Sequence, residues 1–172
     1  MNWRIASILG LAALSSCNGS HPISAAATST SSVGLAANAL FVRDVDGDTI
    51  DVTVDGHAER IRLIGINTPE TVKPNSPVEC FGHEASTFTK SLLSAGEQLH
   101  LERDVEARDA YGRLLAYVYR VSDGLFVNLE VIRQGYAQVL TFPPNVAHTE
   151  DFVGAARAAE AANLGLWEAC GK

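Results

Sequence analysis

Three strand-like stretches that follow one another directly constrain the fold of this chain more than any other feature. They are ALFVRDVD, TIDVTVD and HAERIRLIGI, at residues 39–46, 49–55 and 57–66. In each stretch apolar or β-branched side chains alternate with polar ones, as expected of a strand with one buried face. The second and third stretches meet at Asp55 and Gly56, a pair typical of two-residue hairpin turns. The sequence therefore predicts a meander of three antiparallel strands.

The rest of the chain predicts two more strands and three helices. We expect strands in EQLHLERDV and RLLAYVYRV, at 97–105 and 113–121, and a helix in EASTFTKSLLSAG that ends at Gly96. Two later helices are expected in DGLFVNLEVIRQG and TEDFVGAARAAEAANLG, with Asp123 and Thr149 as their N-caps. This order of elements indicates an α+β fold, mainly β: an OB-fold five-stranded barrel with three appended helices.

Four aspartates crowd into RDVDGDTIDV, at 43–52, where the first two predicted strands meet. Asp44, Asp46 and Asp48 match the spacing of an EF-hand calcium loop. Such a loop needs glycine at its sixth position, where this chain has Thr49, and a helix on each side, so the strand-like flanks exclude it. Two interpretations remain: a plain Asp-Gly hairpin turn with solvated acids, or half of a site that is completed elsewhere in the chain.

Composition favours a single domain. A length of 172 residues with 47% hydrophobic residues is sufficient for one globular domain with a real core, and we assign it to residues 39–172. The formal net charge is −7, whereas strong nonspecific nucleic-acid binders usually carry a basic face. Nucleic-acid binding would therefore need a local positive cleft, for which Arg62, Arg103 and Arg113 are the candidates.

The N-terminus is typical of an export signal. MNWR supplies a positive start, IASILGLAAL is apolar but too short to span a bilayer, and LSSC ends at Cys17. This pattern resembles a bacterial lipobox and predicts a signal peptide at 1–17 with lipidation of Cys17. Residues 18–38 have almost no charged or aromatic side chains and predict a low-complexity linker. The alternative is cleavage within AANA, at 36–39, which would release a soluble secreted protein.

Export determines how the cysteines are interpreted. If Cys17 carries lipid, Cys80 and Cys170 are the two that remain, and an oxidising compartment favours a disulfide between them. The alternative is a pair of buried free thiols. The five histidines show no zinc-like spacing to one another or to the cysteines, so we expect no zinc.

Four short motifs follow one another along the predicted domain: DGDT, RLIGINTPE, DAYGRLLAYVY and VNLEVIRQGYAQV. Taken singly they are ordinary, because Arg62 could be an exposed strand arginine, NTPE a turn and Arg113 a solvated charge. In this order and at these spacings they resemble the staphylococcal nuclease (thermonuclease) family. The resemblance covers about residues 39–167, nearly the whole predicted domain.

The resemblance implies a calcium site. Asp48 would be a direct ligand, the side chain of Asn67 a second, and the backbone carbonyl of Thr68 a third, with Asp46 supporting them from behind. Water and the substrate phosphate would complete a shell of hard oxygen ligands of the kind calcium prefers. The opening run of aspartates would then be half of a site that is completed after the third strand.

The resemblance also implies the catalytic groups. Glu70 corresponds to the family's general base or water-orienting carboxylate, Arg62 and Arg113 to the two guanidiniums that clamp the phosphate, and Tyr111 to a tyrosine that binds a nucleotide phosphate. Arginine suits this role because its fork is bidentate and permanently charged. The implied activity is an endonuclease that acts on DNA and RNA with little sequence preference and leaves 3′-phosphates.

Three positions depart from the family pattern. Asn67 stands where the family usually has aspartate, which removes a negative charge and opens the site to other divalent metals. Ala110 replaces a lysine, and Thr141 stands near the place of a base-contacting tyrosine, where Phe142 could stack instead. The competing interpretation is a non-catalytic OB module on the cell surface that binds nucleic acid or protein. Retention of Glu70 with both arginines argues against it.

The expected partners follow from these assignments. We expect DNA and RNA as substrates, contact with a membrane through the lipid anchor only, and a monomer. The protein would be exported, and either lipid-anchored to a bacterial membrane or secreted.

Overall fold

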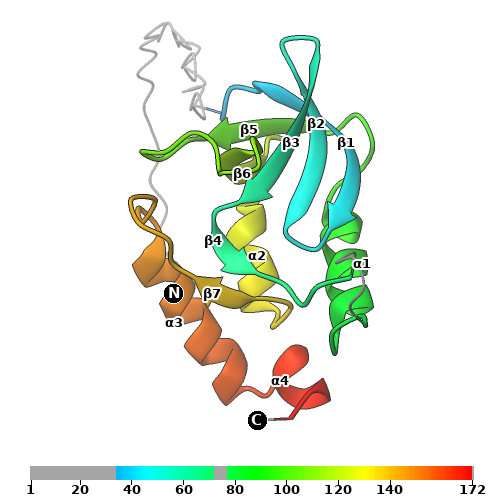
Figure 1. The fold of residues 1–172 in the computed structure, drawn as a ribbon, viewed down its shortest axis with the longest axis vertical. Helices are drawn as coiled ribbons and strands as arrows, with labels where there is room; N and C mark the ends of the chain where they lie inside the picture. The colour runs from blue at the N-terminus through cyan, green and yellow to red at the C-terminus, as the bar shows by residue number, and fades with distance from the viewer. Residues whose placement is uncertain (1–33, 72–76, 172) are drawn as a thin grey trace, which may run out of the picture. The chain divides into compact units, whose positions relative to one another are not determined.

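Five strands close into a barrel with the order β1–β2–β3–β6–β5 (Figure 1). The computed structural model describes residues 34–71 and 77–171, so the proposed signal peptide, the lipidation site at Cys17 and most of the proposed linker lie outside the described residues. The strands are β1 (Ala39–Asp46), β2 (Thr49–Val54), β3 (His57–Leu63), β5 (Gln98–Glu102) and β6 (Leu114–Arg120). All neighbours pair antiparallel except β3 and β6, which are parallel. The predicted barrel is confirmed.

The interior of the barrel follows the alternation seen in the sequence. Ile50 and Val52 of β2, Ile61 and Leu63 of β3 and Leu99 of β5 point inward and are at most 1% exposed. Burying each such side chain stabilises the fold by roughly 1.5–3 kcal/mol. The predicted hairpin turn is also present, because β2 and β3 join at Asp55 and Gly56, both with positive φ.

The third predicted strand is interrupted, contrary to expectation. It ends at Leu63, and a short β4 (Gly65–Asn67) pairs instead with β7 (Gln138–Leu140) in a separate two-stranded sheet. The cause lies at Gly65, whose φ is +83° and where an added Cβ would stand 2.1 Å from the ring of Phe152. This break turns the chain away from the barrel wall, just before Asn67.

The helices gather at one end of the barrel in Figure 1: α1 (Gly82–Leu92), α2 (Val127–Arg133), α3 (Thr149–Ala161) and the short α4 (Leu166–Ala169). The three predicted helices are confirmed, but α1 ends at Leu92 rather than at Gly96, and the predicted caps of α2 and α3 are wrong. Phe126 precedes α2, because Asp123 is engaged with Arg120 and the amide of Leu125. His148 precedes α3, so Thr149 is its first residue.

Two internal links fix the helices to the strands. The buried side chain of Asn128 accepts from the amide of Val118 and donates to the carbonyl of Ile64, which ties α2 to β6 and to the start of β4. Cys80 and Cys170 form a disulfide with an S–S distance of 2.08 Å, which confirms the predicted pair. Within the described residues, none of the helices combines the length and apolar character that a membrane span requires.

Candidate active site

A cavity of about 410 Å³, called the central cavity below, opens where the turn after β1, strand β3 and the segment after β4 meet. It brings together carboxylates, guanidiniums and an amide from separate motifs: Val45, Asp46, Asp48, Thr49, Arg60, Arg62, Asn67, Thr68, Glu70, Glu79 and Arg113. Every residue that the sequence suggested for metal binding or catalysis belongs to this lining. Residues as far apart in the sequence as Asp46 and Arg113 therefore share one site.

The turn between β1 and β2 is buried rather than solvated. Asp46 and Asp48 are only 6% and 7% exposed, so the interpretation as a plain solvated turn is wrong. The Oδ1 atom of Asp46 accepts hydrogen bonds from the amide of Gly47 at 2.9 Å and from Thr71 Oγ1 at 2.7 Å. Thr89 of α1 donates to the carbonyl of Gly47 at 2.6 Å. The turn is therefore held from two sides, as a preorganised site requires.

The same turn packs directly on the segment that follows β4. A Cβ added to Gly47 would lie 2.8 Å from Thr68 Oγ1, so only glycine allows this approach. The amide of Thr68 donates to Asp48 Oδ2 at 3.0 Å, and Thr49 Oγ1 donates to Asp48 Oδ1 at 3.1 Å. The contact explains why the two halves of the site, 20 residues apart in the sequence, stay together.

Arg62 lies between the two side chains proposed as metal ligands. Its Nη2 atom is 3.0 Å from Asp48 Oδ2 and 3.3 Å from Asn67 Oδ1, while Nη1 donates to the carbonyls of Leu63 and Ile66. Burial lowers the pKa of Arg62 from its ordinary value and the charge of nearby Arg113 acts in the same direction, against the raising effect of Asp48. The guanidinium is thus fixed at the floor of the cavity.

Asp48 and Asn67 direct oxygen atoms at one position. A carboxylate oxygen of Asp48 and the amide oxygen of Asn67 converge on Arg62 Nη2, which is the cation between them in this structure. Both are hard oxygen donors, the kind calcium takes. Among residues 34–71 and 77–171, no three His, Cys, Asp or Glu side chains group closely enough to hold a metal by themselves. A metal at this place would therefore depend on amide, carbonyl, water or phosphate oxygens as well.

Glu70 is held through its backbone by Glu79 and through its carboxylate by the amide of Thr71. The amide of Glu70 donates to Glu79 Oε2 at 3.1 Å, and the amide of Glu79 donates to the carbonyl of Glu70 at 3.0 Å. The amide of Thr71 donates to Glu70 Oε1 at 3.1 Å. The reciprocal pair brings the two ends of the 70–79 segment together beside Cys80, which carries the disulfide. The Glu70 carboxylate therefore has a defined position at the edge of the cavity.

Arg113 is positioned by an aspartate that the sequence analysis did not select. Asp109 Oδ2 accepts from Arg113 Nε at 2.7 Å, and Asp109 Oδ1 accepts from the amides of Tyr111 and Arg113. The Arg113 guanidinium lies 5.5 Å from the centre of the Tyr111 ring, within the range of a cation–π contact. One carboxylate thus fixes both the backbone and the side chain of Arg113, just before β6 begins.

A second hollow, called the Phe142 groove, adjoins the central cavity and shares Arg62 and Arg113 with it. It measures about 440 Å³ and is mostly apolar, with Ile64, Leu115, Leu140, Tyr111 and Phe142 in its lining. Phe142 is 71% exposed and Tyr111 86% exposed, so both rings are accessible. Ala110 also lines this groove, and Thr141 is exposed nearby in the sequence.

Sequence reasoning missed three residues at the site, Asp109, Glu79 and Arg60. Asp109 holds Arg113 and Glu79 holds the backbone of Glu70, whereas Arg60 lines the central cavity directly. Only Asp109 left a signal, because it stands four residues before Arg113 across a tight Gly-containing turn. Arg103, by contrast, was expected in the positive cleft and is exposed without entering the lining of the central cavity.

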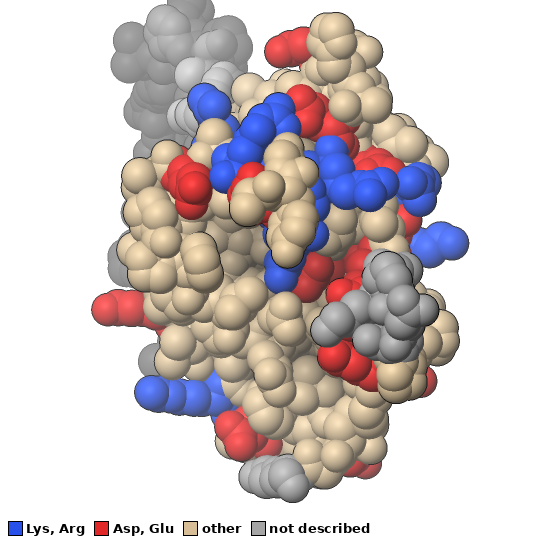
Figure 2. Space-filling model, in the orientation of Figure 1, with Lys and Arg blue, Asp and Glu red and all other residues tan. Residues whose placement is uncertain are grey.

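The charge of the protein is unevenly distributed. Figure 2 shows Lys and Arg side chains collected in a band across the barrel half of the face that carries β2 and β3. Arg60, Arg62 and Arg113 belong to the lining of the central cavity. The same lining holds four carboxylates, Asp46, Asp48, Glu70 and Glu79, so in the central cavity itself carboxylates outnumber arginines by four to three. The positive cleft expected from the sequence is therefore not formed by these side chains alone.

Sequence comparison shows which known proteins the chain is similar to. A sequence profile described as "Staphylococcal nuclease homologue" matches residues 60–169. The chain is 44% identical over 129 residues to the thermonuclease of Staphylococcus intermedius, an alignment that covers 75% of each protein. It is 40% identical over 126 residues to the thermonuclease of Staphylococcus hyicus, covering 73% of each. Endonuclease YncB of Bacillus subtilis is 39% identical over 136 residues, which span 78% of this chain and 63% of the relative.

Proposed function

Since the chain belongs to the staphylococcal nuclease family and is a phosphodiester hydrolase, we propose that it is a calcium-dependent endonuclease. It would cleave both DNA and RNA with little sequence preference and leave 3′-phosphates. The observation that carries this proposal is the convergence of Asp48, Arg62, Glu70 and Arg113 on one cavity. Hydrolysis of a phosphodiester needs such a set, because it requires a hard cation, a carboxylate and fixed cationic donors.

Each group has a role that its position supports. Asp48, the side chain of Asn67 and the backbone carbonyl of Thr68 would hold the metal, with Asp46 bracing the turn behind them. Calcium, when bound, supplies a Lewis acid at the phosphate. The site would also accept other divalent metals, because Asn67 brings an oxygen without a charge.

The chain's own side chains would then accept the proton and stabilise the developing charge. Arg62 and Arg113 bind the phosphate oxygens and stabilise the charge that builds up on them in the transition state. Glu70 accepts a proton from the water that attacks phosphorus. The bond from phosphorus to the 5′-oxygen breaks, and that oxygen leaves with a proton from solvent, while the phosphate stays on the 3′-side. Asp109 holds Arg113 in place for this role.

A degradation assay with matched variants tests this proposal. The wild-type protein should degrade plasmid DNA and RNA with added calcium and lose activity in excess chelator. Glu70→Ala and Arg113→Ala should each lower kcat by roughly a hundredfold or more, because both act at the developing charge. Arg133→Ala, which removes an exposed arginine from α2, is the control and should change kcat less than about twofold.

Two outcomes would contradict the proposal. Undiminished activity in chelator would exclude the metal, and binding of nucleic acid without cleavage in any divalent metal would favour the non-catalytic OB module. Losses below about tenfold in both active-site variants would withdraw the assignment of Glu70 and Arg113.

The location outside the cytoplasm is supported by the disulfide, since such bonds persist in oxidising compartments. We propose further that Cys17 anchors the exported protein to a bacterial membrane, on the strength of LSSC followed by the low-complexity segment 18–38. Detergent-phase partitioning tests the anchor. The wild-type protein should enter the detergent phase and the Cys17→Ala variant the aqueous phase, whereas a mature protein that begins near Leu40 would exclude the anchor.

A further inference from the structure

A third hollow, called the Arg60 groove, adjoins both the central cavity and the Phe142 groove. It measures about 540 Å³ and is lined by residues of β2, β3 and the turn before β6, among them Ala58, Arg60 and Gly112. It shares Arg60 and Arg113 with the central cavity, and Tyr111 and Arg113 with the Phe142 groove. Arg113 therefore stands where all three hollows meet.

This arrangement matches the requirements of an endonuclease. A phosphodiester inside a strand has one nucleotide on each side, so an enzyme that cuts within a strand must accommodate both. If the scissile phosphate lies in the central cavity, the Phe142 groove can take the base of one flanking nucleotide on its exposed aromatic rings. The second flanking nucleotide then needs a separate path away from Arg113, and the Arg60 groove is continuous with that point.

The Arg60 groove has the chemistry that a nucleotide requires. Val42 and Ala58 are exposed in its lining and offer an apolar surface, and Tyr111 provides a ring at one edge. Arg60 lies at the border with the central cavity and supplies a cation there. A volume of about 540 Å³ is within the usual range of small-molecule sites.

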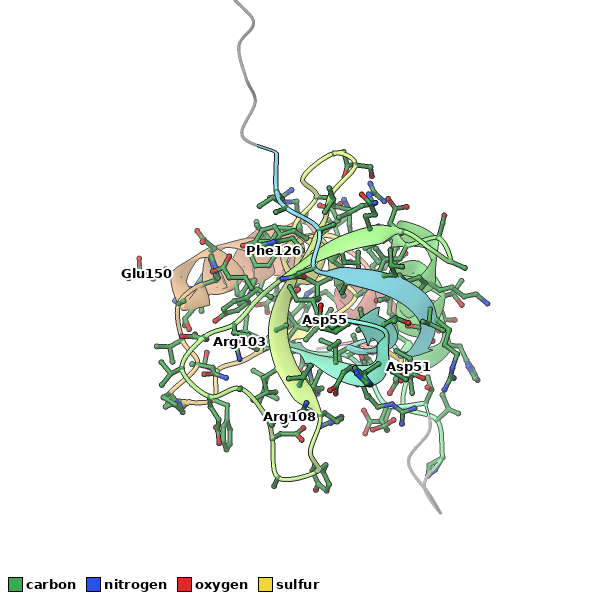
Figure 3. All side chains as sticks on the ribbon, turned by 90° about the horizontal axis from the view of Figure 1, so that it is seen from above. Asp51, Asp55, Arg103, Arg108, Phe126 and Glu150 are labelled. Carbon is green, nitrogen blue, oxygen red and sulfur yellow. A yellow bond between two sulfur atoms is a disulfide. The ribbon has the colours of Figure 1, made fainter. Side chains whose placement is uncertain are left out.

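Ion pairs hold the arginines around this groove in place. Arg60 donates to both oxygens of Asp51, at 2.8 and 3.2 Å, and Arg108 donates to both oxygens of Glu59, at 3.0 and 2.7 Å. Asp51 also pairs with Arg43 at 2.5 Å, and Arg43 is not part of the lining of the groove. Figure 3 shows Asp51 and Arg108 on the same side of the barrel, away from Phe126 and Glu150. Side chains fixed in this way lose little conformational entropy when a ligand binds.

We propose that the Arg60 groove binds the nucleotide on the other side of the scissile phosphate from the nucleotide in the Phe142 groove. The ligand is one sugar–base unit of a single strand, with Arg60 donating hydrogen bonds to its sugar or base and Tyr111 or the Val42–Ala58 surface packing against it. This inference rests on the proposed function, because it needs the scissile phosphate in the central cavity.

Two small substrates with the same leaving group provide the test. One is the thymidine dinucleotide TpT, and the other is the methyl ester of thymidine 5′-phosphate, in which a methyl group replaces the second nucleoside. Both carry one negative charge on the diester and both release thymidine when the bond to the 5′-oxygen breaks. The ratio of kcat/KM for TpT to kcat/KM for the methyl ester therefore measures the binding of the second nucleoside, and general losses of activity cancel.

Three variants give the expected result. Arg60→Gln removes guanidinium donors to the second nucleoside and should lower the ratio roughly fivefold or more, the size of one hydrogen bond that involves a charged group. Ala58→Phe fills the groove from an exposed position and should lower the ratio without changing any charge. Arg43→Gln is the matched control: Arg43 pairs with the same Asp51 but does not line the groove, so its ratio should stay within about twofold of wild type.

The outcomes separate this inference from the proposed function. A ratio unchanged in both Arg60→Gln and Ala58→Phe would overturn the subsite. If Arg43→Gln lowered the ratio as much as Arg60→Gln, the loss would be a general effect of charge, and this too would overturn the subsite. If the wild-type protein cleaves neither these substrates nor plasmid DNA in any divalent metal, the proposed function fails. Equilibrium binding of TpT to the same proteins then decides the inference alone, and equal affinity in wild type, Arg60→Gln and Ala58→Phe would overturn it.

Discussion

At the scale of single residues, the site is defined by one guanidinium that two potential metal ligands share. Arg62 contacts Asp48 and Asn67 at 3.0 and 3.3 Å, so a calcium ion and this arginine would draw on the same oxygens. With Asn67 in place of an aspartate, Asp48 is the single charged side chain proposed as a direct ligand. Because carboxylate count helps to set calcium affinity, we expect weak metal binding without substrate.

Restoring the charge at this position tests that argument. Asn67→Asp should tighten calcium binding in the absence of substrate by roughly 1–3 kcal/mol, the gain from one charged contact in a partly solvated site. Calorimetric titration of calcium into both proteins measures it. Glu130→Gln, which alters a carboxylate on α2 outside the lining of the central cavity, is the control and should leave the affinity unchanged. Equal or weaker calcium binding in Asn67→Asp would show that this side chain does not face the metal.

At the scale of secondary structure, hydrophobic alternation and turn residues were sufficient to predict the barrel strands and the three longer helices. The interruption of the third strand could not be predicted, because Gly65 breaks it only through the approach of Phe152 from α3. The pairing of β4 with β7 is equally a contact between distant segments. Asp123 had the residue type of an N-cap, but its ion pair with Arg120 competes for the same carboxylate.

The candidate site, too, contains residues that could be predicted from the sequence and residues that could not. The order of motifs was sufficient to select Asp48, Arg62, Glu70 and Arg113, which the fold places in one cavity. Asp109 and Glu79 were missed because each acts by holding another residue, and such a role leaves almost no mark on the sequence. The arginine missing from the prediction, Arg60, reaches the cavity through the register of β3, two residues before Arg62.

At the scale of the whole molecule, the disulfide links parts that the barrel alone would not. It joins Cys80, next to the segment that carries Glu70, to Cys170 beyond α4, 90 residues away. In the chain-entropy account, closing a loop of this length stabilises the folded state by roughly 4 to 5 kcal/mol, and measured values are often smaller.

Removal of the bond should therefore lower stability. Cys80→Ser combined with Cys170→Ser is expected to reduce the free energy of unfolding by about 2–5 kcal/mol, measured by urea unfolding at a fixed calcium concentration. Reductant should lower the melting temperature of the wild-type protein but not that of the double variant, which serves as the control. An unchanged wild-type melting curve, with two titratable thiols before reduction, would show that the cysteines are unpaired in the folded protein.

The position of this bond has a consequence for the protein's lifetime among extracellular proteases. Arg113 lies inside the covalent loop from Cys80 to Cys170, whereas Asp48 and Glu70 lie before it. A single backbone cut between Cys80 and Arg113 would produce two fragments, each with part of the site, but the sulfur–sulfur bond would keep them as one molecule. A nicked protein would thus keep its two fragments together, and it should remain active after its backbone has been cut.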